Sequence, residues 1–96
     1  MSPIVTELLE IPNAFTPNDD GKNDVFLPKI FGIDDMNLKI YNRFGQLVFE
    51  SYNPSFGWDG KFQGAPQPID VYAYTLIVKF ADGRTESRKG SVTLIR

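Results

Sequence analysis

The sequence of 96 residues contains no cysteine and no histidine, and it has one tryptophan and two methionines. The absence of cysteine excludes a disulfide scaffold, a cysteine-ligated zinc site and catalysis by a thiol. The absence of histidine removes the commonest general base and the commonest ligand of transition metals. Catalysis would depend on carboxylates, lysines, serines or tyrosines alone, so the composition favours a protein that binds over one that transforms a substrate.

Charge and hydropathy exclude two further classes of partner. The net charge is −2, and acidic and basic residues are interspersed, so there is no polybasic field for nucleic acid or anionic lipid. Every apolar run is far shorter than the ~20 residues that a membrane-spanning helix needs. The N-terminal residues Met1-Ser2-Pro3 lack the basic start of a signal peptide. We therefore expect one small domain without membrane insertion, whose export signal, if it has one, lies in a longer precursor.

Turn-forming residues fill the segment Pro12–Phe26, PNAFTPNDDGKNDVF, between an apolar anchor at each end. Pro17 fixes its own φ, Gly21 can adopt positive φ, and the Asn and Asp side chains can bond nearby backbone groups. This density of conformationally special residues predicts a loop of one defined shape. The first anchor, Ala14-Phe15, is expected to end a short strand.

The same loop also allows interpretation as a calcium site. Its oxygen ligands would come from the side chains of Asn18, Asp19, Asp20, Asn23 and Asp24, with Asn18, Asp20 and Asp24 as the preferred set. With Gly21 as the sixth position of an EF-hand loop, Thr16 falls at position one and Leu27 at position twelve, where acids are required. The EF-hand pattern fails, so a calcium site and a set of self-satisfied turns remain as alternatives.

Period-two alternation predicts strands along the rest of the chain. We expect an opening strand over Ile4–Ile11, a short strand over Val25–Leu27, and a connection over Lys29–Asp35. Alternation then predicts a hairpin over residues 36–50. Its turn, Asn42-Arg43-Phe44-Gly45, fits a type I turn whose final glycine takes the left-handed conformation of a G1 bulge.

A long hairpin is predicted for the last third of the chain. Asp70–Phe80 forms the outgoing strand, a tight Asp-Gly turn follows, and Thr85–Arg96 returns. Pairing Lys79 with Glu86 places opposite charges opposite each other. This register puts Val92 and Leu94 on the face of Val71, Ala73 and Ile77, and Tyr72, Tyr74, Leu76, Val78 and Phe80 opposite polar residues. A bulge near Gly90 is therefore expected to change the buried side of the returning strand.

The tryptophan segment and the loop after it complete the prediction of fold class. Trp58 lies between glycines, and we favour a core position for its indole over an exposed platform. Lys61–Pro68 is too rich in glycine and proline for a regular element. Six or seven short strands with turns between them, and no helical periodicity, predict an all-β protein, a small antiparallel immunoglobulin-like β-sandwich.

Four blocks of sequence resemble the gliding-motility-associated C-terminal domain, the type B C-terminal sorting domain of the type IX secretion system of Bacteroidetes-type bacteria. The blocks are PNAFTPNDDGKNDVF, LKIYNRFGQLVFES, GWDGKFQGAPQPIDVYAYTL and DGRTESRKGSVTLIR. They carry the structural motif positions Pro12, Asn13, Phe15, Pro17, Gly21, Asn23, Asp24, Asn42, Arg43, Gly45, Trp58, Asp59, Gly60, Tyr72, Tyr74 and Gly83. One departure is Ile69-Asp70, where many members have a glycine, and we expect only a changed turn there.

The resemblance implies a sorting module at the C-terminus of a large secreted protein. Such a module directs its passenger from the periplasm across the outer membrane to the cell surface or medium. Its implied partners are the type IX secretion machinery and an outer-membrane β-barrel protein of the PorP/SprF type. It implies no cofactor and no enzymatic activity, and Arg96 would be the natural end of the precursor. We expect residues 1–96 to form this single domain and to be monomeric in isolation.

Two segments are candidates for recognition by the partner, the final strand and the polar loop. The candidate residues are Lys89, Gly90, Ser91, Thr93, Ile95 and Arg96 of the strand, with Asn18, Asp19 and Asp20 of the loop. An exposed strand edge can bind by adding a strand to a partner's sheet. The alternative is that the final strand closes the sandwich, with Val92 and Leu94 in the core.

Two other functions remain open from the sequence. A carbohydrate-binding or adhesive β-sandwich would use Trp58, Tyr52 and Tyr72 as stacking surfaces. A hydrolase would use a pair of carboxylates among Asp19, Asp20, Asp24, Asp34, Asp35, Asp59 and Asp70. No spacing pairs two of these acids across a cleft, and Asp59-Gly60 and Asp82-Gly83 are turn sequences first.

Overall fold

The computed structural model describes residues 8–18, 21 and 24–95, and these ranges contain strands and no helix. Nine strands follow one another along the chain. They are β1 (Leu8–Glu10), β2 (Ala14–Phe15), β3 (Lys29–Phe31), β4 (Ile33–Tyr41), β5 (Leu47–Ser51), β6 (Lys61–Phe62), β7 (Ala65–Pro66), β8 (Asp70–Phe80) and β9 (Thr85–Leu94). The prediction of an all-β fold is confirmed.

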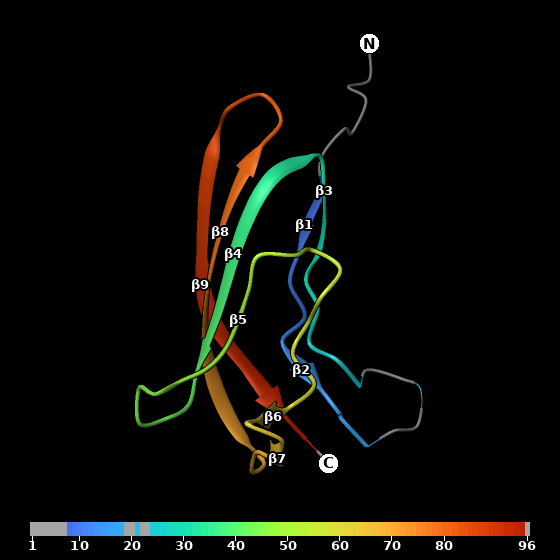
Figure 1. Cartoon of the computed structure of the whole chain (residues 1–96), viewed down its shortest axis with the longest axis vertical. Helices are drawn as coiled ribbons and strands as arrows, with labels where there is room; N and C mark the ends of the chain where they lie inside the picture. The colour runs from blue at the N-terminus through green and yellow to red at the C-terminus, as the bar shows by residue number, and fades with distance from the viewer. Residues whose placement is uncertain (1–7, 19–20, 22–23, 96) are drawn as a thin grey trace.

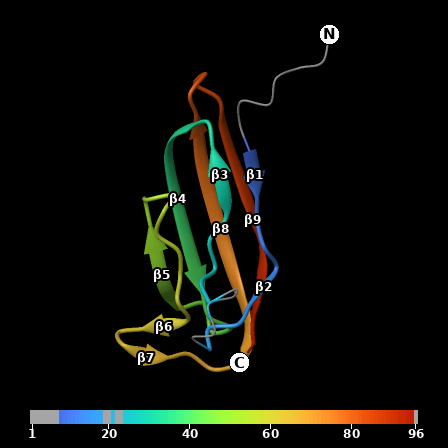
Figure 2. The ribbon, with the colours of Figure 1, turned by 90° about the vertical axis from the view of Figure 1, so that its right-hand side faces the viewer.

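The strands form two layers (Figures 1 and 2). The main layer is a five-stranded sheet of order β2-β9-β8-β4-β5, antiparallel except where β2 runs parallel to β9. The second layer contains the antiparallel pair β1-β3 and an isolated bridge between Phe26 and Trp58. The chain crosses from the second layer to the main sheet between β1 and β2, where Pro12 has no N–H to donate to a ladder. The result is an antiparallel β-sandwich.

The β4–β5 hairpin closes as its sequence predicts. The backbone N–H of Gly45 donates to the carbonyl of Asn42 at 3.0 Å, and Gly45 has a φ of 80°. The Asn42 side-chain oxygen accepts the N–H groups of Phe44 and Gln46. The ladder shifts register between Ile40 and Tyr41, next to this turn. Asn42 thus fixes the turn and Gly45 supplies the left-handed residue.

The β8–β9 hairpin has a different register from the predicted one. Lys79 lies opposite Thr85, and Glu86 lies opposite Val78, so the predicted pairing of Lys79 with Glu86 is wrong. The cause is a turn of three residues, because the N–H of Phe80 donates to the carbonyl of Arg84 at 2.7 Å. A shift of one residue exchanges the two faces of a strand.

This register puts the apolar residues of both strands on one face without a bulge. Pairing is continuous from Asp70 opposite Leu94 to Lys79 opposite Thr85, so the bulge expected near Gly90 is wrong. The buried residues of the pair are Tyr72, Leu76, Val78, Phe80, Val92 and Leu94. Gly90 lies opposite Tyr74, and a Cβ at Gly90 would come within 2.9 Å of the Tyr74 hydroxyl. Glycine therefore makes room for the tyrosine ring.

An aromatic cluster joins the two layers, and its members are Phe15, Phe26, Trp58 and Tyr72. The Trp58 ring lies 5.4 Å from Phe15 and 4.9 Å from Tyr72, the latter edge to face. Trp58 is fully buried, and its Nε1–H donates to the carbonyl of Lys61 at 2.9 Å. The Tyr72 hydroxyl donates to the carbonyl of Pro68 at 2.7 Å, in the manner of the tyrosine corner of immunoglobulin-like sandwiches. The predicted core position of Trp58 is confirmed.

Three short segments differ from the prediction. Val25–Leu27 is not a strand, since only Phe26 forms a bridge, and the strand lies in Lys29–Phe31, which was predicted to be a connection. Lys61–Pro68 contains the small hairpin β6–β7 in place of an irregular loop. Its turn uses Gln63 and Gly64, both at positive φ. Glycine and proline therefore occupy the turn and end of this hairpin and do not prevent it.

Replacing Gly45 by valine tests the β4–β5 turn. We expect Gly45→Val to lower the free energy of unfolding by about 1–2 kcal/mol, the cost of a left-handed conformation for an L-residue. Gly45→Asn is the control, because asparagine adopts this conformation more readily. Chemical denaturation measures both variants. Equal stability of the valine variant and the wild type would contradict the role of Gly45.

Candidate functional site

The polar loop is closed by Asp24. Its Oδ2 accepts the backbone N–H of Gly21 at 2.7 Å, and its Oδ1 accepts the N–H of Asn18 at 3.2 Å. Both carboxylate oxygens therefore hold the loop backbone, as the interpretation of self-satisfied turns expects. Of the predicted ligands and recognition residues, Asp19, Asp20 and Asn23 lie outside the described residues, so the calcium site stays a prediction.

Calcium binding and a purely structural role of Asp24 predict different melting behaviour. We expect Asp24→Ala to lower the melting temperature equally in calcium and in a calcium chelator, because two backbone N–H groups lose their acceptors. Thermal denaturation of both proteins in both buffers is the measurement. A melting temperature that rises with calcium in the wild type and not in Asp24→Ala would instead establish the metal site.

The final strand has two parts with different surroundings. Val92 and Leu94 are buried, and the N–H groups of Thr93 and Ile95 donate to the carbonyls of Asn13 and Phe15 at 2.9 and 3.0 Å. This end of β9 closes the sandwich against β2. The earlier residues Lys89, Gly90 and Ser91 are exposed, and Arg96 lies outside the described part. The C-terminal end of β9 therefore contributes to the core, and the residues just before that end expose polar groups.

An open edge precedes the part of β9 that β2 covers. Alternate residues of a strand direct their backbone groups to opposite sides, and the N–H of Thr93 points to β2. The N–H and C=O groups of Thr85, Ser87, Lys89 and Ser91 therefore point away from β8 on that same side. Within residues 8–18, 21 and 24–95, β2 pairs with β9 at Thr93 and Leu94 and leaves these four unpaired by any strand. We call these four backbone positions the open edge.

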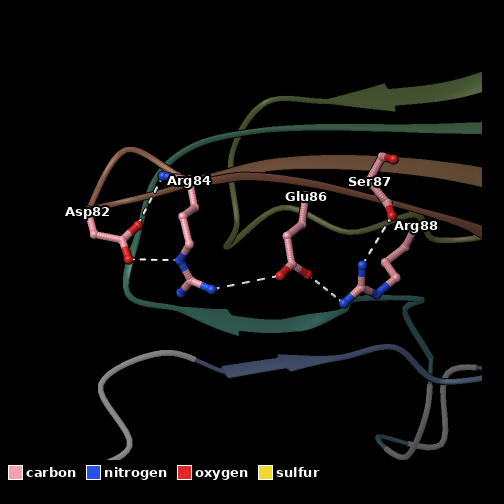
Figure 3. Close-up of polar contacts among 5 residues, drawn as sticks. All are labelled: Asp82, Arg84, Glu86, Ser87 and Arg88. Atoms are coloured by element: carbon pink, nitrogen blue, oxygen red, sulfur yellow. Dashed lines mark hydrogen bonds and ion pairs between the residues drawn. The ribbon is translucent and has the colours of Figure 1, made fainter.

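A row of alternating charges runs beside the open edge (Figure 3). The row consists of Asp82, Arg84, Glu86 and Arg88. Arg84 Nε donates to Asp82 Oδ2 at 2.8 Å, and its Nη1 lies 3.9 Å from Glu86 Oε1. Arg88 Nη2 donates to the other Glu86 oxygen at 2.5 Å, while its Nη1 donates to the carbonyl of Ser87 at 3.1 Å. One carbonyl of the open edge is thus covered by a neighbouring side chain.

The charge row shares the core-facing side of the sheet. Glu86 and Arg88 lie opposite Val78 and Leu76, which are buried, and the Arg84 guanidinium lies 4.9 Å from the centre of the Phe80 ring. Sequence reasoning missed this row, although charges of alternating sign at every second position, DGRTESR, are its signal. Of these charges, only Glu86 entered the prediction, in its incorrect pairing with Lys79.

The contribution of Asp82 to the stability of the β8–β9 turn depends on pH, because its carboxylate accepts hydrogen bonds from Arg84. The backbone N–H of Arg84, and then its side chain, hold the pKa of Asp82 below its ordinary value. The ionised carboxylate therefore stabilises the fold above that ordinary value of about 4, and this contribution is lost as the pH falls through the lower folded-state pKa. We expect the wild type to be more stable than Asp82→Asn at pH 7, and the difference to shrink as the pH falls below that ordinary value. A difference independent of pH would contradict this assignment.

Three further aspartates accept hydrogen bonds from the backbone close to them in sequence. Asp35, Asp59 and Asp70 each accept a backbone N–H from the residue one or two positions later, at 2.8–3.0 Å. Asp70 also lies 3.7 Å from the Arg43 guanidinium. In the described part of the chain, no three His, Cys, Asp or Glu side chains are grouped to hold a metal ion. These contacts assign the acids to turns and strand ends.

The alternative of a sugar-stacking surface made of Trp58, Tyr52 and Tyr72 is wrong, because Trp58 and Tyr72 are buried in the core. Tyr52 is exposed, and its hydroxyl donates to Glu50 Oε2 at 3.0 Å, next to an Asn37 amide that donates to the same oxygen at 2.9 Å. The Asn37 amide, and then Tyr52, lower the pKa of Glu50, and the bond to Glu50 raises the pKa of Tyr52.

These features define a class of protein: an immunoglobulin-like sandwich with a buried aromatic cluster and, in its described part, a last strand whose edge is only partly covered. The family of the CHU_C Type IX secretion signal domain matches residues 9–94. The chain belongs to this family, which confirms the resemblance of the four sequence blocks. The domain is therefore a sorting signal for type IX secretion, which implies interaction with the secretion machinery and export to the cell surface or medium.

Comparison with solved structures agrees with the fold. The chain is similar to CopC from Methylosinus trichosporium OB3b with a TM-score of 0.60, covering 92% of each chain at 17% identity. At this identity the similarity shows the fold alone. No curated protein matches the sequence. The described residues include no helix with the length and apolar character needed to span a membrane.

Proposed function

We propose that this domain directs a large passenger protein through the type IX secretion system by being recognised, while folded, by components of the outer membrane. The family match over residues 9–94 is the observation that carries the proposal. The main sheet and the aromatic cluster both lie within the matched residues 9–94. The family's sequence signal and the fold therefore have the same extent.

A signal that is recognised in the folded state needs a rigid scaffold and a few presented groups. The scaffold is the buried cluster around Trp58, where the indole N–H and the Tyr72 hydroxyl both have backbone acceptors. The presented groups are the polar loop around Asn18 and the exposed residues Lys89–Ser91. Five of the described aspartates, Asp24, Asp35, Asp59, Asp70 and Asp82, accept backbone N–H groups, which supports a domain that acts by recognition and not by catalysis.

The finer assignments follow from the family resemblance. The passenger would cross the inner membrane first and reach the outer membrane from the periplasm. There the domain would meet an outer-membrane β-barrel of the PorP/SprF type. Residues 1–96 would form one C-terminal domain of a longer protein, monomeric in isolation. The loop residues Asn18, Asp19 and Asp20 and the strand residues from Lys89 onward are the candidate contacts.

A passenger fused to the domain tests the proposal in a bacterium with type IX secretion. We expect export of the fusion and no export of the passenger alone. Leu94→Ala should lower the free energy of unfolding by about 2–5 kcal/mol, because a buried side chain is truncated, and export should fall with the folded fraction. The amount of passenger outside the cell is measured beside the stability of the purified domain.

Deleting Gly90–Arg96 does not separate recognition from folding. The deletion removes Val92 and Leu94 from the core and the two backbone bonds to β2, so we expect loss of fold and loss of export together. Ile95→Ser is a milder control, since this side chain is partly exposed and the N–H remains. Normal export of a variant that is unfolded in isolation would refute recognition of the folded domain.

A further inference from the structure

In the described part of the chain, the longest strand pair, β8–β9, has a hydrogen-bonding edge that no other strand pairs with along residues 85–91. β9 is a ten-residue strand of the main sheet. Within the described ranges, β2 pairs with the last two of these residues. The row of N–H groups that begins with Thr93 donating to Asn13 extends along β9 to the open edge. Such a row is a template for another extended chain.

We infer that the open edge receives an extended, acidic segment of a partner protein as an additional strand. This inference rests on the proposed function and names the surface through which recognition takes place. The pairing that β2 already makes shows that this side of β9 accepts a strand. The new strand would lie beside Thr85–Ser91 and end where β2 begins.

The other edge of the main sheet is a poorer template. β5 has five residues, and the register of its ladder is shifted beside the β4–β5 turn. Phe49 of this strand packs against Phe56, with ring centres 5.7 Å apart, so the following segment lies against β5. A long and regular edge offers more backbone bonds to a docking strand, which favours β9.

Charge determines which segment fits the open edge. Residues 82–91, which include the charge row, contain three cations, Arg84, Arg88 and Lys89, and two acids, Asp82 and Glu86, so cations exceed acids by one. Glu86 is shared between two arginines, and Lys89 lies exposed on the opposite face of the strand. Acidic side chains on the incoming strand would find cations on both faces.

The side chains of the open edge allow close approach on the outer face. Thr85, Ser87 and Ser91 are small hydroxyl residues, and Lys89 is the one long side chain among the four positions. Affinity would therefore come from backbone bonds, and specificity from charge. Arg88 covers the Ser87 carbonyl and must turn away when a strand docks. Pairing of two copies through this edge is disfavoured, because it joins two segments with an excess of positive charge.

Proline at an outward-facing N–H tests strand addition in the full fusion protein. Ser87→Pro removes an N–H that does not pair with β8 and places the ring on the open edge, whereas Ser87→Ala changes the side chain and keeps the N–H. We expect about a tenfold or larger fall in exported passenger for Ser87→Pro and less than about a twofold change for Ser87→Ala. Circular dichroism and melting of the purified domains establish that both remain folded.

Charge reversal provides a second test that keeps the backbone intact. Lys89→Glu reverses a cation of the open edge, and Lys61→Glu makes the same change in the β6–β7 hairpin. We expect reduced export for Lys89→Glu and wild-type export for Lys61→Glu. This pair also decides the question if Ser87→Pro does not fold.

The outcomes separate this inference from the proposed function. If the wild-type fusion is not exported, the proposed function fails. If the wild type is exported and the folded Ser87→Pro and Lys89→Glu variants are exported equally well, the open edge is not the docking surface. Sedimentation analysis tests whether a second copy of this domain occupies the edge. A wild-type dimer that Ser87→Pro makes monomeric would assign the edge to that second copy and overturn the inference.

Discussion

The contact of Trp58 with Phe26 is the constraint on which the rest of the structure depends. The two residues exchange backbone hydrogen bonds of 2.8 and 3.0 Å, and both side chains are buried. The bridge requires glycine at position 57, because a Cβ there would overlap the Phe26 carbonyl oxygen. It joins the end of the polar loop to the tryptophan segment and brings both onto the main sheet. Phe15, at the other end of the loop, packs against the same indole.

Anchoring of the loop determines which part of β9 is covered. With Phe15 held against Trp58, the two residues of β2 lie beside Thr93 and Leu94 and bond their strand. Before Asn13, whose carbonyl accepts the Thr93 N–H, the chain leaves for the second layer. The open edge of β9 is a direct result of the shortness of β2.

Much of this fold could be predicted from the sequence because its signals are local. Alternation in residues 36–41 and the Asn42–Gly45 turn sufficed for the first hairpin. The β8–β9 register could not be predicted, since Asp82-Gly83 is compatible with turns of two or three residues and the charges of Lys79 and Glu86 favoured the wrong one. The open edge escaped prediction for another reason. It depends on where β2 docks, which a tertiary contact with Trp58 decides.

The charge row protects the open edge from aggregation while leaving most of the edge accessible to a partner strand. An exposed regular edge promotes aggregation, and inward-pointing charges beside an edge are a known protection against it. Arg84, Glu86 and Arg88 supply such charges, and Arg88 also occupies the Ser87 carbonyl. A protein that merely avoided aggregation could have covered the whole edge by extending β2. Because the row covers only the Ser87 carbonyl among the backbone groups of the open edge, the rest of that backbone remains accessible to a strand that can satisfy the arginines, as strand addition requires.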